Sequence, residues 1–304
     1  MNSLSILIPT YNDPCFELVS QLQRQAQALD IPYEILVADD GSDDTAVVKL
    51  NRGINLLPNC QYLEQPQNIG RSAIRNFLAQ QAHYNWLLFI DGDMLCREQE
   101  FLLNYRHSLE DNSEYSIVYG GVNIGPLLSG NLRSLYEHAT APQHTVECRR
   151  KAPYHDFHTA NFLISRDVML RHLFDLRFRH YGYEDVLFGK QMEQHHIAIL
   201  HIDNPLTIER FEHNADFILK TEEGIRTLYE FRDELNGYSR LLSAFQHPLS
   251  SLFTPLLSLW HHLFKSLEHR NLCSSCPSLL IFRLYKLGYM AQLISTPSLD
   301  RSDE

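Results

Sequence analysis

The chain has 304 residues, of which 44% are hydrophobic and 21% are charged, and its formal net charge is −11. This composition is typical of a globular protein that buries a full core, which excludes a mainly disordered, collagenous or coiled-coil chain. The excess of acidic residues argues against nucleic acid as a partner, because its phosphate backbone attracts basic proteins.

The cysteines and the apolar runs predict where the protein resides. Six cysteines are scattered along the chain, and Cys273 and Cys276 form the only CxxC spacing among them. No uncharged apolar run reaches the roughly 18 residues of a membrane-spanning helix, and the first apolar run lacks the basic start of a signal peptide. We therefore expect a cytoplasmic protein with reduced thiols.

The first 90 residues alternate between apolar runs of strand length and segments with helical spacing. Strands are predicted at 4–8, 33–38, 60–63 and 86–90, and helices at 16–29, 43–50 and 69–81. Ser42 or Asp43 is expected to cap the second helix. The alternation predicts an α/β fold with a mixed, mostly parallel sheet flanked by helices.

The pattern becomes less regular after residue 100. Strands are predicted at 117–122, 161–165 and 197–202, a helix from Gly182 to about His195, and a long helix at 216–235. Residues 130–155 show no clear periodicity.

Polar clusters follow three of the predicted strands. Thr10-Tyr11-Asn12 follows the first strand, Asp39-Asp40 the second, and Asp91-Gly92-Asp93 the strand at 86–90. Ligands of such sheets bind beyond the carboxyl ends of the strands, so one shared pocket is predicted there. A GxGxxG motif does not follow the first strand, which disfavours a dinucleotide-binding enzyme.

Asp91 and Asp93 are separated by one glycine at the end of an apolar strand. Two carboxylates in this position can hold a hard divalent cation through oxygen ligands, and the cation can neutralise a diphosphate. A solvated turn with two exposed aspartates is the alternative, because short motifs often match by chance.

Residues 3–220 resemble family 2 glycosyltransferases, which have the nucleotide-sugar-binding GT-A fold. Five motifs in the expected order carry the resemblance: Ser5-Ile-Leu-Ile-Pro-Thr-Tyr-Asn12, Glu34-Ile-Leu-Val-Ala-Asp-Asp-Gly-Ser42, Asn68-Ile-Gly-Arg-Ser-Ala-Ile-Arg-Asn76, Asp91-Gly-Asp93 and Tyr181-Gly-Tyr-Glu-Asp185. The resemblance implies an inverting enzyme of bacterial polysaccharide type. Its donor would be a nucleoside-diphosphate sugar, first of all a UDP-sugar, its acceptor a glycan or lipid-linked glycan, and its cofactor Mn²⁺ or Mg²⁺.

The resemblance also implies a nucleotide-sugar pocket. Its residues would be Pro9, Thr10, Tyr11, Asp39, Gly70, Arg71, Arg75 and Asp91. Tyr11 offers an aromatic face for a base, and Asp39 resembles the aspartate that accepts a hydrogen bond from uracil, although helix capping by Asp39 or Asp40 is an alternative. Arg71 and Arg75 share one helix face and could pair with phosphate, with Asp91, or with solvent alone.

The acceptor side is implied by Tyr183-Glu184-Asp185. An inverting transfer needs a base for the acceptor hydroxyl, and the resemblance assigns this role to Asp185 and a contact with sugar or acceptor to Glu184. A helix start favours an ionised carboxylate, which would be ready to act as a base. Helix capping by the two acidic residues is the other interpretation. Asn161 is expected to face the acceptor cleft, and His155 and His158 to line it, to lie at the surface or to act as ligands.

Two positions depart from the family pattern. Ile74 stands where an alanine is usual before Arg75, and Ile208 stands where close relatives carry a histidine. If that histidine binds metal elsewhere, the metal site here consists of Asp91, Asp93 and a third residue. His201 is the candidate named for it, with Glu209 and His213 nearby, although a lone histidine on a strand is more often structural.

The chain is expected to divide at residue 246. Residues 1–246 would form the glycosyltransferase domain, with a nucleotide-sugar half at about 1–122 and an acceptor half at about 123–246. Residues 247–304 would form an amphipathic helical extension, in which 247–290 carry a charge of +3 against −12 for 1–246. The stretches 252–264 and 279–294 predict contact with the inner face of a membrane, packing onto the domain, or a homodimer face.

Two other functions fit parts of the pattern. A haloacid-dehalogenase-like phosphotransferase also places an aspartate pair after a strand, although its nucleophile normally lies near the chain start. A degenerate transferase could serve as a nucleotide-sugar-binding subunit, against which the intact Asp91, Asp93 and Asp185 argue.

Overall fold

The computed structural model describes residues 1–248 and 250–296, and the chain divides into two compact units. The first unit consists of Met1–Gly125, Ala141–Arg179 and Glu184–Arg210, and the second of Pro126–Thr140, His180–Tyr183 and Phe211–Glu304. These units divide the chain at other points than the predicted boundary at residue 246, which remains a prediction.

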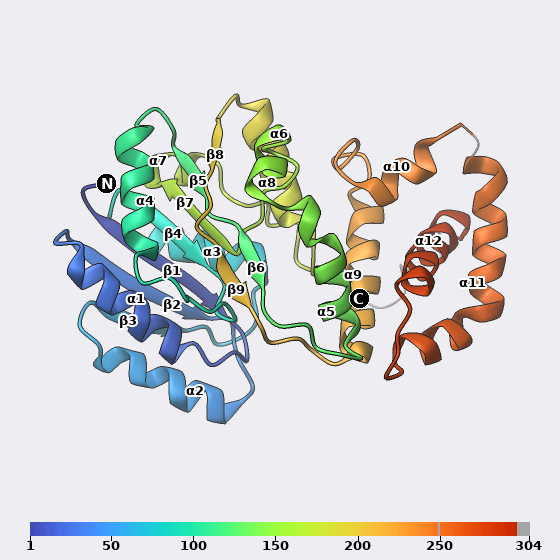
Figure 1. Ribbon diagram of the computed structural model, residues 1–304, viewed down its shortest axis with the longest axis horizontal. Coiled ribbons are helices and arrows are strands. Elements are labelled where there is room, and N and C mark those ends of the chain that lie inside the picture. The colour runs from blue at the N-terminus through green and yellow to red at the C-terminus, as the bar shows by residue number, and fades with distance from the viewer. Residues whose placement is uncertain (249, 297–304) are drawn as a thin grey trace. The chain divides into compact units, whose positions relative to one another are not determined.

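A seven-stranded mixed sheet forms the centre of the first unit (Figure 1). The strand order is β3-β2-β1-β4-β7-β5-β8, with β1 Leu4–Thr10, β2 Tyr33–Asp39, β3 Cys60–Glu64, β4 Trp86–Ile90, β5 Ile117–Tyr119, β7 Asn161–Ser165 and β8 Ile199–His201. Strand β7 runs antiparallel to β4 and β5, and the other neighbours are parallel. The predicted fold class is confirmed.

The central strands are buried on both faces because they are continuous apolar runs. Leu7 of β1 pairs with Phe89 of β4, and the Phe89 ring stacks on Phe162 of β7 with centroids 4.9 Å apart. The parallel register also places Thr10 beside Asp39 at the carboxyl ends of β1 and β2. Asp91 follows β4 at the same edge, so the sheet brings the predicted polar clusters together.

Helices flank this sheet in Figure 1. They are α1 Phe16–Ala28, α2 Thr45–Asn51, α3 Arg71–Gln81, α4 Phe101–Asp111, α6 Val146–Lys151, α7 Arg166–Arg171 and α8 Glu184–Gln194, with short 3₁₀ turns η1 Arg52–Leu56 and η2 Ala141–Gln143. The sequence did not predict α4, α6 or α7. Amphipathic spacing explains α1, which buries Leu18, Val19 and Leu22 against the sheet.

The cap of α2 differs from the prediction. Asp44, rather than Ser42 or Asp43, accepts hydrogen bonds from the backbone N–H groups of Ala46 and Val47. The side chain of Ser42 is unavailable because it donates to Asp39 and accepts from the N–H of Asn12. The sequence could not show this tertiary use of Ser42.

The strand predicted at 117–122 is broken. It ends at β5 and resumes as β6 Val122–Ile124, which pairs with β9 Leu206–Ile208 in a separate two-stranded sheet. Gly121 has a φ of +92° between them, a conformation that glycine adopts at little cost. A β-carbon on Gly120 would lie 2.5 Å from the side-chain nitrogen of Asn161, so the chain turns where only glycine fits.

The second unit is helical. It contains α5 Leu132–Thr140, α9 Asn214–Glu230, α10 Arg240–Gln246, α11 Ser250–Leu272 and α12 Leu279–Ser295. Its core consists of Leu132, Ile218, Leu272, Phe282 and Tyr285. Helix α9 begins before and ends before the predicted 216–235. Among the described residues, none of the helices has the length and apolar character needed to cross a membrane.

Candidate active site

The turn after β4 is packed tightly against the end of β1. The N–H of Gly92 donates to the carbonyl of Pro9 at 3.3 Å, and the N–H of Asp91 donates to the carbonyl of Ala160 at 3.2 Å. A β-carbon on Gly92 would lie 3.0 Å from the hydroxyl oxygen of Thr10. The glycine between the two aspartates therefore permits the contact that holds Asp91 and Asp93 in place.

The predicted donor-side residues at the end of β1 differ in exposure. Thr10 is buried and donates to the carbonyl of Asp13 at 3.0 Å. Tyr11, by contrast, has 45% of its surface exposed, which leaves its ring open to a ligand. The carbonyl oxygen of Pro9 accepts the hydrogen bond from the N–H of Gly92. Pro9 and Thr10 thus position the loop, and Tyr11 is the member that offers a free aromatic surface.

Two arginines of α3 connect Asp91 with Glu184. Arg75 Nη2 lies 2.6 Å from Asp91 Oδ1, and Arg75 Nη1 lies 3.6 Å from Glu184 Oε1. Arg71 Nε lies 2.7 Å from the same Glu184 oxygen, and its Nη2 lies 3.6 Å from Asp91 Oδ2. Arg75 and Glu184 are almost fully buried, whereas Arg71 is 41% exposed. The cluster therefore presents one accessible guanidinium at the carboxyl edge of the sheet.

The start of α3 is fixed by Asp40 and Gly70. Asp40 accepts from the N–H of Ile69 at 2.7 Å and from the N–H of Gly70 at 3.1 Å. Burial raises the pKa of Asp40, against the lowering effect of these two bonds. Gly70 has a φ of +91°. Asp40 thus orients the loop that leads to Arg71 and Arg75, in agreement with a structural role.

Asp39 is 2% exposed, and both of its oxygens have partners. Oδ1 accepts from the N–H of Ser42 at 3.0 Å and from its hydroxyl, and Oδ2 accepts from the hydroxyl of Tyr62 at 2.6 Å. Burial, together with the bond to Asp39 and its charge, raises the pKa of Tyr62 well above its usual range. The sequence did not point to Tyr62, which lies on the neighbouring strand β3 and aligns the carboxylate.

The first turn of α8 places Asp185 beside Glu184. Gly182 and Tyr183 precede the helix with φ values of +97° and +70°, and a positive φ is unusual for tyrosine. Asp185 Oδ2 lies 3.0 Å from Nδ1 of His158, and its Oδ1 accepts from the N–H of Val186 at 2.8 Å. The side chain of Asp185 is 20% exposed, so it remains accessible to a substrate.

The pKa of Asp185 is held below its ordinary value. Burial alone would raise it, but the hydrogen bond and charge of His158, the N–H of Val186 and the charge of Arg71 outweigh that effect. Asp185 is therefore ionised at neutral pH and can accept a proton. His158 was predicted from the sequence to lie near the acceptor, but its contact with Asp185 was not predicted because 27 residues separate the two along the chain.

Asn161 does not face a cleft as expected, because it is fully buried. Its side-chain nitrogen donates to the carbonyls of Gly121 at 2.8 Å and Asn204 at 2.9 Å, and its oxygen accepts from the hydroxyl of Tyr105 at 2.7 Å. All of these partners are internal. Asn161 stabilises the turn between β5 and β6.

His201 is also buried, and both ring nitrogens have partners. Nε2 lies 2.8 Å from the carbonyl oxygen of Pro153, and Nδ1 lies 3.3 Å from Nη1 of Arg149. Burial, aided by the charge of Arg149, lowers the pKa of His201 to about 4. A metal would have to displace one of these partners, so this arrangement does not suit the metal-ligand role predicted for His201.

The carboxylates after β4 suit a metal that arrives with its ligand. Within residues 1–248 and 250–296, no three His, Cys, Asp or Glu side chains are grouped to hold an ion. Asp93 is partly exposed, and Asp91 is paired with the two arginines. Mg²⁺ is commonly held by one or two carboxylates together with substrate phosphates. The oxygen donors present therefore fit Mn²⁺ or Mg²⁺ only when a diphosphate completes the site.

Arg210 lies beside the same turn and was not predicted. Its Nη2 lies 3.5 Å from the carbonyl oxygen of Gly92, and its Nη1 lies 3.9 Å from Asp13 Oδ1. It follows Ile208, the position at which a histidine was expected, by two residues. The positive charge of Arg210 therefore lies close to the turn that carries Asp91 and Asp93.

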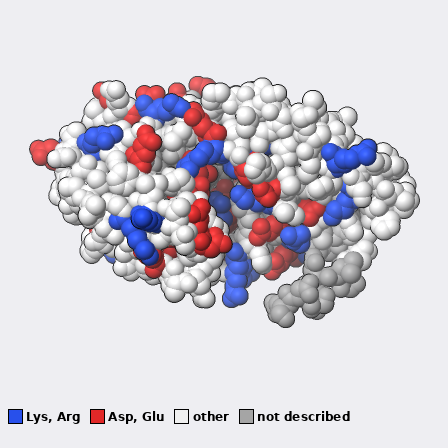
Figure 2. Space-filling view, turned by 90° about the horizontal axis from the view of Figure 1, so that it is seen from below, with Lys and Arg blue, Asp and Glu red and all other residues white. Residues whose placement is uncertain are grey.

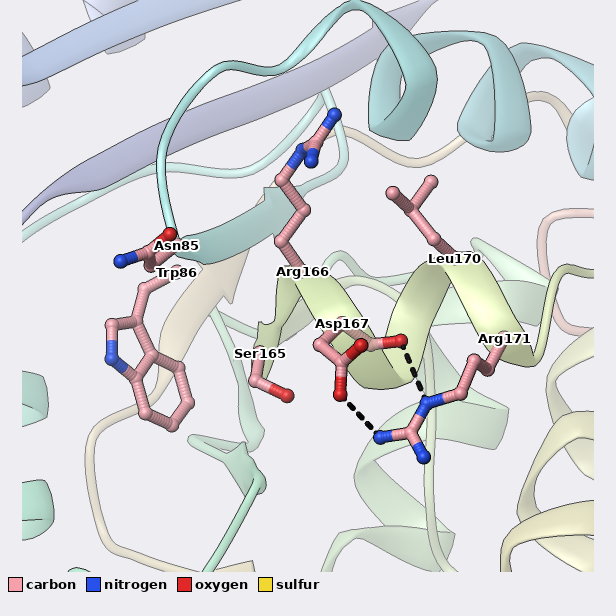
Figure 3. A pocket seen from close by; sticks show the side chains of 7 residues that line it. All are labelled: Asn85, Trp86, Ser165, Arg166, Asp167, Leu170 and Arg171. Carbon is pink, nitrogen blue, oxygen red and sulfur yellow. Dashed lines mark hydrogen bonds and ion pairs between the residues drawn. The ribbon is translucent and has the colours of Figure 1, made fainter.

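A cavity of about 410 Å³ lies elsewhere in the first unit (Figure 3). Trp86, Ser165 and Arg166 line it, and Asp167 pairs with Arg171 at its rim. Trp86 begins β4, whereas Asp91 follows its end. This cavity is therefore at the opposite edge of the sheet from the aspartate turn.

Sequence comparisons identify related proteins. The family model described as "Glycosyl transferase family 2" matches residues 5–173. The chain is 33% identical over 95 residues to a chondroitin synthase of Escherichia coli, and 31% identical over 117 residues to a poly(ribitol-phosphate) beta-glucosyltransferase of Bacillus spizizenii. The matches cover 31% and 38% of this chain but 14% and 18% of the two relatives, so the chain corresponds to a small part of each.

Two solved structures resemble the fold over almost its whole length. TarS of S. aureus, residues 1–349, has a TM-score of 0.52 at 15% identity, with 99% of this chain and 94% of that one covered. A mannosyltransferase of Pyrobaculum calidifontis, solved with GDP-Man and Mn²⁺, has a TM-score of 0.57 at 13% identity, with 98% and 87% covered. At these identities the similarity establishes the fold, which is the GT-A fold.

Proposed function

The chain belongs to glycosyl transferase family 2 and is a glycosyltransferase, and we propose the following reaction for it. It transfers a sugar, with inversion, from a nucleoside-diphosphate donor to a hydroxyl group of a glycan or lipid-linked acceptor. The observation that supports this best is the cluster of Asp91, Arg71, Arg75 and Glu184 beside the ionised Asp185. The residues proposed to bind the diphosphate thus lie next to Asp185, the proposed base.

The donor occupies the carboxyl ends of β1, β2 and β4. Tyr11 stacks on the base, Asp39 recognises it, and Arg71 meets the diphosphate with its exposed guanidinium. Uracil suits Asp39 because its N–H can donate to a carboxylate. We therefore place a UDP-sugar first among donors, and the mannosyltransferase neighbour, solved with GDP-Man, makes GDP-sugars the comparison.

Mn²⁺ or Mg²⁺ would be held by Asp93, with Asp91 adjoining it and the donor diphosphate supplying the remaining oxygens. When bound, the ion neutralises the charge of the departing diphosphate. Arg210 adds a second positive charge near the same turn. His201 is left out of this set because its ring nitrogens are both engaged.

Asp185 accepts the proton of the acceptor hydroxyl. The acceptor oxygen then forms a bond with the anomeric carbon from the face opposite the diphosphate, and the bond from that carbon to the diphosphate oxygen breaks. The nucleoside diphosphate leaves, so the configuration inverts. Glu184, held by both arginines, keeps the first turn of α8 in place for this step.

The chondroitin synthase and the poly(ribitol-phosphate) beta-glucosyltransferase favour a polymeric acceptor, because both enzymes are named for a polymer. The phosphotransferase alternative has no support from the family match, and Asp91, its required nucleophile, is ion-paired with Arg75. A subunit that binds nucleotide sugar without transferring it is the remaining competitor.

A panel of nucleotide sugars tests the proposal by thermal shift, with and without Mn²⁺. Binding to the native state raises stability by about 2.7 kcal/mol at a hundredfold excess over Kd, so a UDP-sugar with Mn²⁺ should raise Tm most. NMR of the product with the donor so identified should show an inverted anomeric centre. Stabilisation by GDP-sugars alone would show that the donor carries guanine rather than uracil. Binding without transfer or hydrolysis would support a non-catalytic subunit that only binds the nucleotide sugar.

A further inference from the structure

One face of α11 carries large apolar side chains that the rest of the described chain leaves about half exposed. Seven of them form what we call the α11 stripe: Leu252, Phe253, Leu256, Leu259, Trp260, Leu263 and Leu267, each 45–65% exposed. At 3.6 residues per turn they fall within an arc of about 120°. The buried residues Thr254, His261 and Glu268 lie on another side of the helix, and His261 contacts Tyr285 of α12.

The size of the stripe distinguishes it from ordinary surface leucines. Single exposed apolar residues are common, but a contiguous row along a helix marks an interaction site. The helix has 23 residues, which corresponds to about 35 Å at 1.5 Å per residue. The row is therefore long enough to lie along an extended surface.

The charges around the stripe indicate which surface it is. Between Ser250 and Ser295, Glu268 is the one acidic residue. It is buried, accepts a hydrogen bond from the indole N–H of Trp260 at 2.9 Å and contacts His261. Arg270 continues the stripe at its C-terminal end, and His262 and His269 are exposed along one side. The stripe is thus bordered by Arg270 and two exposed histidines and by no exposed carboxylate of this segment.

Figure 2 shows one face of the protein, on which the surface at the right of the view is mainly uncharged and carries patches of Lys and Arg. A two-fold interface brings the same patch against itself, so a second copy would offer Arg270 no carboxylate. An anionic lipid surface supplies the missing negative charge and accepts the apolar row.

A small apolar cavity supports a lipid partner. It measures about 290 Å³ and is lined mainly by Phe245, Phe253, Leu257 and Leu287, from α10, α11 and α12. Phe253 belongs to both the cavity wall and the α11 stripe. An acyl chain displaced by the helix could therefore enter the unit beside the stripe.

We propose that α11 lies in the plane of an anionic bilayer, with the α11 stripe among the acyl chains and Arg270 at the phosphate groups. Helices with one apolar face and a basic border bind membranes in this way. Such binding does not depend on the proposed sugar transfer, although it would bring the enzyme to lipid-linked acceptors. Vesicle binding therefore tests it separately from activity.

The first experiment is co-sedimentation of the full chain with phosphatidylcholine vesicles, with and without phosphatidylglycerol. Binding is expected with phosphatidylglycerol, and salt should weaken it because surface attraction is screened within about 10 Å at 0.1 M. The double variant Leu256→Glu/Leu263→Glu should lose at least tenfold in affinity. Leu219→Glu in α9 is the matched control, since Leu219 is 61% exposed and the two stripe leucines are 63% and 62% exposed.

Two further variants separate the apolar and charged contributions. The chain has two tryptophans, Trp86 and Trp260, so vesicles should shift the emission to the blue in the wild type but not in Trp260→Phe. Arg270→Glu should weaken binding by about fivefold or more, since each cation near an anionic surface contributes about 1 kcal/mol. Unchanged circular dichroism and Tm confirm that the exposed substitutions leave the fold intact.

Three results would overturn the proposal. The first is no binding of the full chain to phosphatidylglycerol vesicles at low salt. The second is equal binding by the double variant and Leu219→Glu. The third is a dimer, seen by light scattering, that the double variant dissolves while vesicles bind neither protein, which would assign the α11 stripe to an interface between copies.

Discussion

Nδ1 of His158 lies 3.0 Å from Oδ2 of Asp185, and this contact ties the loop before β7 to the first turn of α8. The imidazole is 44% exposed and the carboxylate 20%, so both groups can meet a substrate. The bond and the charge of His158 are the strongest influences that lower the pKa of Asp185. His158 is therefore a positioning residue that keeps the proposed base ionised.

Replacement of His158 should move the pH dependence of transfer. In His158→Gln the pKa of Asp185 rises, because the lowering influence is removed, so the base becomes protonated at a higher pH. The acidic limb of the kcat/KM profile is then expected at higher pH than in the wild type. His155→Gln, an exposed histidine on the same loop, is the control and should keep the wild-type profile.

An unchanged acidic limb in His158→Gln would contradict this coupling. A uniform loss of rate at every pH, without a displaced limb, would instead assign His158 to substrate binding.

Asp185→Asn tests the base itself. The substitution keeps the shape of the side chain and removes its basicity, so transfer should fall about 10²-fold or more. Donor affinity, measured by calorimetry, should change little because the proposed donor site consists of other residues, among them Asp39, Arg71 and Asp93. Asp167→Asn, an exposed carboxylate on α7, serves as the control. Nearly normal turnover in Asp185→Asn would move the base elsewhere, with Glu184 the first candidate.

Much of the fold could be predicted because its central strands are continuous apolar runs. Strands β1, β2 and β4 match the predicted 4–8, 33–38 and 86–90 within two residues. Helix α4 gave no signal at its start, since Glu100 makes no side-chain capping bond. Strand β9 has only three residues, too few for an alternating pattern to be recognised.

The site was predictable by residue type but not by partner. Asp91 and Glu184 stand out in their motifs, but both pair with Arg75. Arg75 and Glu184 are 109 residues apart along the chain. Neither Tyr62 nor Arg210 carries a local signal, because each acts through a tertiary contact. Spacing along the chain cannot show such contacts. His201 and Asn161 were predicted to contact a metal and the acceptor cleft, but both side chains are buried.

Asp93→Ala tests the metal assignment. The carboxylate is expected to supply an oxygen ligand that the diphosphate cannot replace, so the gain in UDP affinity on adding Mn²⁺ should disappear. Calorimetric titrations of UDP with and without Mn²⁺ measure this gain, and Glu98→Ala, an exposed carboxylate of the same unit, should retain it. A full metal-dependent gain in Asp93→Ala would show that other residues hold the ion. Arg210, with its charge near the turn, is expected to preserve weak metal-independent binding.

Arg75 should contribute far more to stability than Arg71, although both pair with Asp91 and Glu184. Arg75 is 2% exposed, and its removal leaves Asp91 without its closest partner and Glu184 with Arg71 alone. Loss of one member of a buried ion pair costs about 3–5 kcal/mol, whereas exposed pairs contribute about 0–1 kcal/mol. Urea unfolding should therefore show a loss of about 3 kcal/mol or more for Arg75→Met and a smaller loss for Arg71→Met, whose side chain is 41% exposed. UDP affinity should follow the opposite order in variants that remain folded, because the guanidinium of Arg71 is the one open to a diphosphate. If Arg71→Met bound UDP as well as the wild type, the diphosphate would have to lie away from α3.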